Sequence, residues 1–116
     1  MTRLQKLFAD KRSNILNIYF TAGFPKLEDT ARIILSLDKA GVDLIEIGMP
    51  YSDPMADGET IQRSGAQALE NGMKLKVLFE QLTNIRKESS IPIILMGYFN
   101  QVMQFGEENF LSLIHI

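Results

Sequence analysis

Three short apolar segments alternate with segments of helical periodicity, and this alternation constrains the fold most. The apolar, β-prone segments are residues 15–21, 44–47 and 93–96. Apolar side chains recur at helical spacing in residues 27–40, 60–70, 74–88 and from 107 onward. Strands that are apolar throughout are typical of a parallel sheet covered on both faces and joined by right-handed crossovers. The order βαβαβα therefore predicts an α/β fold, which either an open sheet or a barrel satisfies.

Composition limits the chain to one soluble globular unit. Its 116 residues are 46% hydrophobic and 22% charged, with 12 Lys and Arg against 14 Asp and Glu. This balance offers no broad basic surface for nucleic acid. The longest apolar run, residues 91–99, is far too short to cross a bilayer. Because cysteine is absent and His115 is the single histidine, we predict no disulfide, no metal site and a cytoplasmic location.

Two carboxylates suggest acid–base chemistry. Glu46 interrupts the apolar run 42–49, and Asp57 follows in a loop that contains Pro50 and Pro54. A carboxyl group on a buried strand favours its protonated form and can donate a proton, whereas a loop carboxylate kept ionised by solvent and backbone N–H groups can accept one. Ordinary structural roles remain open for both, because Glu46 can pair with a neighbouring cation and an Asp before Gly is common in turns.

The polar and glycine-containing residues of the chain follow its three predicted strands. They occupy residues 21–23, 46–57 and 96–100. In parallel α/β folds, ligands bind where the carboxyl ends of neighbouring strands meet. We therefore expect these three connections to form one mouth.

Three motifs identify a family resemblance. The segments are YFTAGFP at 19–25, EIGMPYSDPMADG at 46–58 with ETIQ following, and MGYFNQV at 96–102. In this order and spacing they closely resemble the tryptophan synthase α subunit family. The resemblance implies a (β/α)₈ TIM barrel that cleaves indole-3-glycerol phosphate to indole and glyceraldehyde 3-phosphate in tryptophan biosynthesis. It also implies no cofactor in this subunit, and a partner β subunit that carries pyridoxal phosphate and receives the indole within an α2β2 complex.

The resemblance assigns roles to individual residues. Glu46 matches the acid/base group that protonates indole C3, and Asp57 matches the carboxylate that interacts with the indole N–H. Three residues match positions that line the indole pocket, although ordinary barrel packing remains open for Met96: Tyr19, Met96 and Tyr98. Three more match positions that face the β subunit, although a turn-forming role remains open for Asp53: Asp53, Pro54 and Asn100.

Length sets this chain apart from a complete barrel, which needs about 250 residues. We therefore read residues 1–116 as the N-terminal portion of a single TIM-barrel domain, its first three β/α units, and expect a sequence shortened at its apolar end, 110–116. The loops that hold the substrate phosphate late in the barrel are then missing, so the isolated chain should be inactive. Open sheet edges should make it self-associate. The alternative is a non-catalytic, self-associating half-barrel module that binds a partner such as the β subunit.

Overall fold

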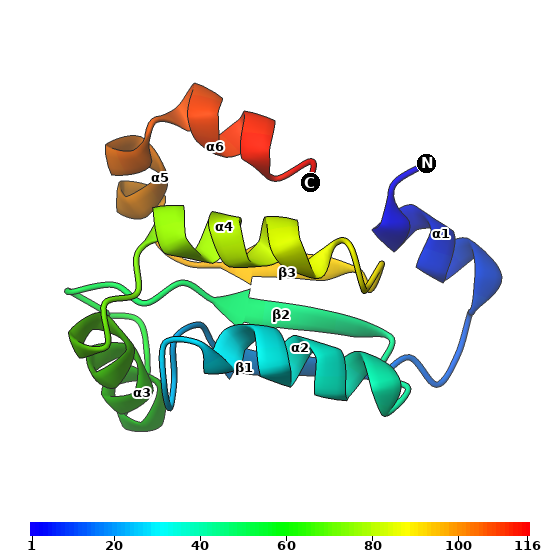
Figure 1. Ribbon diagram of the computed structural model, residues 1–116, viewed down its shortest axis with the longest axis horizontal. Helices are drawn as coiled ribbons and strands as arrows, with labels where there is room; N and C mark the ends of the chain where they lie inside the picture. The colour runs from blue at the N-terminus through cyan, green and yellow to red at the C-terminus, as the bar shows by residue number, and fades with distance from the viewer.

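The computed structural model describes residues 1–116, and its strands and helices alternate as the sequence predicts (Figure 1). The strands are β1 (Asn17–Thr21), β2 (Leu44–Gly48) and β3 (Ile93–Met96). The helices are α1 (Arg3–Asp10), α2 (Asp29–Lys39), α3 (Glu59–Glu70), α4 (Leu75–Ile85), α5 (Phe99–Phe105) and α6 (Glu107–Leu113). No helix is long and apolar enough to cross a membrane.

The three strands form one parallel sheet in the order β1-β2-β3. The register places Tyr19 opposite Glu46 and Glu46 opposite Ile94. At the carboxyl ends, Thr21 is opposite Gly48, which is opposite Met96. Because neighbouring residues in register point to the same side of a sheet, Tyr19, Glu46 and Ile94 share one face.

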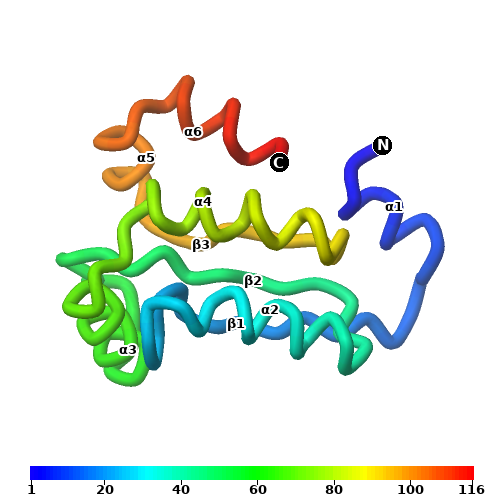
Figure 2. Tube along the Cα trace, in the orientation of Figure 1, coloured from blue at the N-terminus to red at the C-terminus, as the bar shows by residue number.

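Helices α2 and α4 lie together against the opposite face of the sheet, as Figures 1 and 2 both show. Ile45 and Ile47 of β2 are fully buried there against Ile34 of α2 and Leu82 of α4. Complete burial of a side chain of this size stabilises the fold by roughly 1.5–3 kcal/mol. The apolar residues of β2 therefore fix the helical layer on this side.

The second face of the sheet is not covered as the sequence predicts. On that face, Ile94 and Met96 remain 37% and 39% exposed, and Glu46 is half-buried. The prediction of cover on both faces is therefore wrong for the part of this face on β3, where Ile94 and Met96 are exposed, although Thr21 and Leu44 on the same face are buried. We call this surface the open face. It carries Asn17, Tyr19, Thr21, Leu44, Glu46, Gly48, Ile94 and Met96.

Helix α5 occupies a segment that the sequence predicts as a loop. Asn100 consequently lies in the first turn of a helix. The cause is Gln101, whose side-chain oxygen accepts a hydrogen bond from the backbone N–H of Tyr98 at 2.8 Å. This contact satisfies one of the donors that a helix leaves unpaired at its N-terminus. A seven-residue helix shows too little periodicity to be detected from sequence alone.

Asp43, which lies just before β2, forms hydrogen bonds at the amino-terminal side of the sheet. It accepts hydrogen bonds from the backbone N–H of Leu16 at 2.7 Å and from Lys11 Nζ at 2.9 Å. The Leu16 N–H, followed by the Lys11 ammonium group, lowers the pKa of Asp43 below its usual value. These contacts tie the segment between α1 and β1 to the start of β2.

Candidate active site

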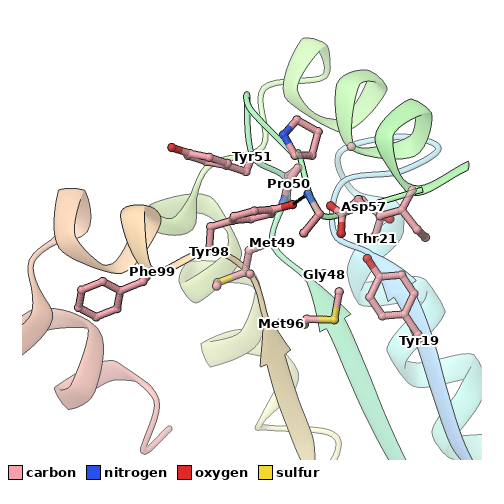
Figure 3. A pocket seen from close by; sticks show the side chains of 15 residues that line it. Tyr19, Thr21, Gly48, Met49, Pro50, Tyr51, Asp57, Met96, Tyr98 and Phe99 are labelled. Atoms are coloured by element: carbon pink, nitrogen blue, oxygen red, sulfur yellow. Dashed lines mark hydrogen bonds between the residues drawn. The ribbon is translucent and has the colours of Figure 1, made fainter. Parts of the chain in front are cut away.

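The carboxyl ends of the strands surround a cavity of about 490 Å³ (Figure 3). Its walls come from the ends of all three strands, the loop between β2 and α3, and the first turns of α3 and α5. The lining residues are Tyr19, Thr21, Gly48, Met49, Pro50, Tyr51, Pro54, Ala56, Asp57, Ile61, Gly65, Met96, Gly97, Tyr98 and Phe99. The structure thus confirms one shared mouth, and its size and mixed lining suit a small, flat organic ligand.

Tyr19 lies across the open face with its hydroxyl over Gly48. A Cβ atom placed on Gly48 would overlap the Tyr19 hydroxyl oxygen and would lie 2.8 Å from Cζ. Glycine is therefore required at position 48 for the ring to reach the cavity. Burial raises the pKa of Tyr19, a side-chain hydrogen bond with Thr21 opposes that shift, and the charges of Asp57 and Glu46 add to it. The shift thus favours the protonated form that a tyrosine hydroxyl already has at neutral pH.

Asp57 reaches the cavity from the loop between β2 and α3. Its backbone N–H donates to Pro54 O at 3.1 Å, and its carbonyl accepts from Gln62 Nε2 at 2.8 Å. The loop is therefore held through its backbone. In Figure 3 the Asp57 carboxylate is directed into the cavity beside Thr21, above the Tyr19 hydroxyl. We expected backbone N–H groups to donate to this carboxylate. The backbone N–H of Asp57 instead donates within the loop, so the carboxylate oxygens face the space where a ligand would bind.

Glu46 is placed differently from Asp57. It is absent from the cavity lining, and its Oε2 accepts a hydrogen bond from Asn17 Nδ2 at 3.1 Å. Its side chain is half-buried because it lies on the open face. The expectation of a carboxyl group enclosed in apolar surroundings is therefore wrong for this structure. Nor does Glu46 pair with a cation, which the sequence left open, since its partner is a neutral amide.

Tyr98 joins two of the loops that form the cavity. Its hydroxyl oxygen accepts a hydrogen bond from the backbone N–H of Ala56 at 2.9 Å. Its ring stacks on Tyr51, with the centroids 5.0 Å apart and the planes at 25°. The β3–α5 connection therefore supports the loop that carries Asp57. Met96 also lines the cavity and lies outside the buried core, which favours a pocket position over ordinary packing.

The three predicted interface residues are spread over two segments. Asp53 is exposed and accepts a hydrogen bond from Ser52 Oγ at 3.0 Å, while its carbonyl accepts from Met55 N at 2.9 Å. It thus contributes to a turn, as the sequence allowed. Pro54 lines the cavity, and Asn100 is exposed on α5. The structure therefore brings only Pro54 into the cavity wall.

Two contacts that support the site were missed from sequence. Gln101 is buried and donates through Nε2 to Pro50 O at 2.9 Å, which fixes the start of the loop between β2 and α3, called the acidic loop because it carries Asp53 and Asp57. Thr21 and Ser64 approach each other through their hydroxyls at 2.8 Å, which joins the end of β1 to α3. A buried glutamine or threonine that contacts a distant segment leaves no periodic signal in a sequence. No three His, Asp or Glu side chains gather closely enough to hold a metal ion.

A family model described as tryptophan synthase alpha chain matches residues 4–115. The chain belongs to this family. It is 63% identical over 106 residues to the tryptophan synthase alpha chain of Flavobacterium psychrophilum, and this match covers 91% of the chain and 41% of the relative. It is 57% identical over 110 residues to the alpha chain of Bacteroides thetaiotaomicron, covering 95% of the chain and 43% of the relative. The chain thus spans somewhat under half the length of the tryptophan synthase alpha chains that it matches.

Solved structures agree with the family assignment. Tryptophan synthase subunit alpha from Legionella pneumophila superposes with a TM-score of 0.91 at 36% identity, over 97% of this chain and 45% of that one. A chain of the tryptophan synthase complex from Pyrococcus furiosus superposes with a TM-score of 0.79 at 44% identity, over 86% of this chain and 41% of that one. The three-stranded sheet and its helices therefore form part of a TIM barrel, as the resemblance implied.

Proposed function

We propose that this chain supplies the catalytic face of a tryptophan synthase alpha-type lyase, which cleaves indole-3-glycerol phosphate to indole and glyceraldehyde 3-phosphate. One observation carries the proposal. Asp57, Tyr19, Met96 and Tyr98, which the family resemblance selects, all line one cavity at the carboxyl ends of the strands. Glu46 lies directly opposite Tyr19 in the sheet. The aromatic and methionine walls suit a flat indole ring, and the carboxylates suit its proton transfers.

The proposed reaction is a carbon–carbon bond cleavage that needs only proton transfers from the protein. Asp57 accepts a hydrogen bond, and then the proton, from the indole N–H, which raises electron density at ring carbon C3. Glu46 donates a proton to C3. The bond between C3 and the glycerol carbon then breaks as the Glu46 carboxylate takes the proton of the side-chain hydroxyl, which becomes the aldehyde. The ring recovers its aromatic electrons, and its nitrogen takes back the proton held by Asp57, which releases neutral indole. This scheme requires no metal, Schiff base or cofactor in the α subunit, and we place it in the cytoplasm with the rest of tryptophan biosynthesis.

We propose that the 116-residue chain is inactive by itself and that residues 1–116 are the first part of a single barrel domain. Strands β1 and β3 are the two edges of the sheet, and on the side beyond them no further strand completes the wall of the cavity. A substrate there stays exposed to water, which weakens every electrostatic contact with it. Further β/α units would close this side and provide the backbone N–H groups that bind a phosphate.

We also propose a β subunit as partner, bound near the outer rim of the cavity. Asp53 is exposed there, Pro54 forms the rim, and Asn100 is exposed on the neighbouring helix α5. A partner seated on these residues would reach the loop that carries Asp57. Such contact gives the partner a direct way to alter the position of a catalytic carboxylate.

The test is indole release by a chimera in which this chain replaces the matching part of the Flavobacterium psychrophilum alpha chain. We expect the chimera to release indole from indole-3-glycerol phosphate, and the 116-residue chain alone to release none. Glu46→Gln and Asp57→Asn should each lower kcat at least about 100-fold. The matched controls are Glu70→Gln and Asp10→Asn, whose side chains are exposed at helix ends. Near-normal turnover in either test variant, with folding intact, would contradict the assigned roles.

A second candidate function is a self-associating, non-catalytic module that binds a partner such as the β subunit. Two observations favour it. Ile94 and Met96 are exposed on the open face, and an apolar cavity of about 310 Å³ lies along β3 between α4 and α6. Sedimentation of the isolated chain tests this candidate. A defined dimer that Ile94→Asn dissociates, together with β-subunit binding and no turnover, would support it, whereas a monomer would exclude it.

A further inference from the structure

Three side-chain hydroxyl groups form a connected line from α3 to the cavity. Ser64 Oγ of α3 lies 2.8 Å from Thr21 Oγ1 at the end of β1, and it donates to Ile61 O at 3.1 Å. Thr21 forms a side-chain hydrogen bond with Tyr19, which is two residues earlier and therefore on the same face of β1. We call the hydroxyls of Ser64, Thr21 and Tyr19 the hydroxyl chain. Its cavity end is Tyr19, because Ser64 does not line the cavity.

The Tyr19 hydroxyl is directed toward Asp57. The ring reaches this position because residue 48 is glycine, where a Cβ would overlap the hydroxyl oxygen. In Figure 3 the hydroxyl points to the Asp57 carboxylate. The hydrogen bonds of Asp57 involve its backbone, so its carboxylate can accept one from Tyr19. Glu46 also lies opposite Tyr19 in the sheet, but its carboxylate accepts from Asn17.

The charge of Asp57 determines the direction in which the hydroxyl chain donates. A hydroxyl carries one proton and two lone pairs, and it rotates to suit its partners. An ionised carboxylate only accepts, so Tyr19 gives its proton to Asp57. Thr21 can then donate to Tyr19, and Ser64 can donate to Thr21. Ser64 gives up the carbonyl of Ile61, which lies within α3 and keeps the backbone partner of a helical residue.

We propose that Tyr19 is a positioning residue whose hydroxyl, oriented by Thr21 and Ser64, donates to one oxygen of Asp57 and leaves the other oxygen for the indole N–H. This inference rests on the proposed function, because that function makes Asp57 the acceptor of the indole proton. A hydrogen bond to a charged group is stronger than one between neutral groups. It restrains the carboxylate to the orientation in which the proton transfer occurs.

The ring and the hydroxyl of Tyr19 have separable roles in this proposal. The ring forms part of the cavity wall, and Tyr19→Phe keeps that wall. Only the hydroxyl reaches Asp57 and Thr21. Loss of the hydroxyl should therefore affect the chemical step more than it affects the binding of substrate, which is a pattern that kcat and KM distinguish.

The experiment removes the hydroxyls in the chimera described above and measures kcat and KM for indole release. Tyr19→Phe removes the cavity end of the hydroxyl chain, Thr21→Val removes its middle, and Thr21→Ser keeps a hydroxyl there. The matched control is Thr83→Val, because Thr83 is exposed on α4 and its hydroxyl donates to Phe79 O. Thermal unfolding confirms that each variant is folded. If Thr21→Val does not fold, Ser64→Ala takes its place.

We expect Tyr19→Phe and Thr21→Val each to lower kcat about tenfold, because a carboxylate without its restraint is less often aligned with the indole N–H. KM should stay within about threefold. Thr21→Ser should bring kcat back to within about threefold of the unsubstituted chimera. The double variant should lose about tenfold and not about a hundredfold, because both changes break the same chain. The control should stay within about twofold.

Multiplied losses of kcat in the double variant would overturn the inference, as would a Thr21→Ser variant no more active than Thr21→Val. A rise in KM with kcat unchanged would overturn it too, since Tyr19 would then serve as a wall only. Equal losses in the control would do the same, because they would reveal a general effect on the fold.

A second measurement does not depend on activity. Tyr19→Phe and Asp57→Ala are made singly and together in the 116-residue chain, and each variant is unfolded in urea. The losses of stability should be less than additive, because each change removes the same hydrogen bond. Additive losses would overturn the inference. Absence of indole release from the unsubstituted chimera would instead refute the proposed function, and the urea measurement then decides whether Tyr19 holds Asp57.

Discussion

Replacing Gln101 should loosen the acidic loop by an amount that the structure allows us to estimate. Gln101 is buried, with 8% of its surface exposed, and it joins two segments of the chain. Its Oε1 accepts from Tyr98 N at 2.8 Å, and its Nε2 donates to Pro50 O at 2.9 Å and, less closely, to Met49 O at 3.3 Å. Gln101→Met keeps the length of the side chain and removes all three contacts. The two shorter bonds, at about 0.5–1.5 kcal/mol each, give an expected loss of about 1–3 kcal/mol.

Urea unfolding of the 116-residue chain, followed by circular dichroism, measures this loss. The matched control is Gln104→Met, because Gln104 lies on the same helix and is exposed. We expect the control to change the free energy of unfolding by less than about 0.5 kcal/mol. In the chimera, Gln101→Met should also raise KM, since Pro50 begins the loop that carries Asp57. The reasoning fails if the two variants unfold at the same urea concentration.

Three further predictions concern the fold that holds the site. Ile45→Ala should lower the free energy of unfolding in urea by about 2–5 kcal/mol, whereas Ile94→Ala on the open face should lower it by less than about 1 kcal/mol; equal losses would show that both faces are buried. Gly48→Ala should displace the Tyr19 ring, destabilise the chain by about 1–3 kcal/mol and raise KM in the chimera. Gly58→Ala serves as its control, because a Cβ at position 58 would meet nothing within 4 Å. Asp43→Asn should lower the urea midpoint at neutral pH, because a carboxyl group with a lowered pKa stabilises the fold while it is ionised. Protonation removes that stabilisation as the pH falls through the lowered pKa, so the difference from the unsubstituted chain should disappear in acid, and a constant difference would contradict the account.

The sequence predicts the layout of the elements well because that layout depends on local patterns. The three strands and the helices α2, α3 and α4 follow from apolar spacing, and a parallel sheet then brings their connections to one edge. Asp57, Tyr19, Met96 and Tyr98 therefore meet in one cavity, as expected from their places in the chain. The fold determines the position of a residue at the end of a strand, so that position can be predicted without knowledge of the residue's individual contacts.

The features that the sequence does not reveal depend on contacts between distant residues. The buried role of Gln101 requires the backbone of residues 49–50 to pass beside α5, which no local pattern encodes. The exposure of Ile94 and Met96 was also mispredicted, because an apolar strand reads the same whether its second face is covered or open. Sequence patterns thus indicate which side chains a segment can bury. The number of strands present determines which of those side chains are buried in the structure.

The contrast between the two carboxylates follows from the same distinction. Both lie where the sequence places them, yet Asp57 is fixed by loop contacts near its own backbone, whereas Glu46 is directed by Asn17 on the neighbouring strand. The loop contacts span only a few residues, so they form whenever the loop and α3 form. The Asn17 contact exists only in the observed register, because a one-residue slip of β1 would move Asn17 to the other face. The direction of Glu46 is therefore a property of the assembled sheet, and substitutions that disturb the pairing of β1 with β2 should affect Glu46 before they affect Asp57.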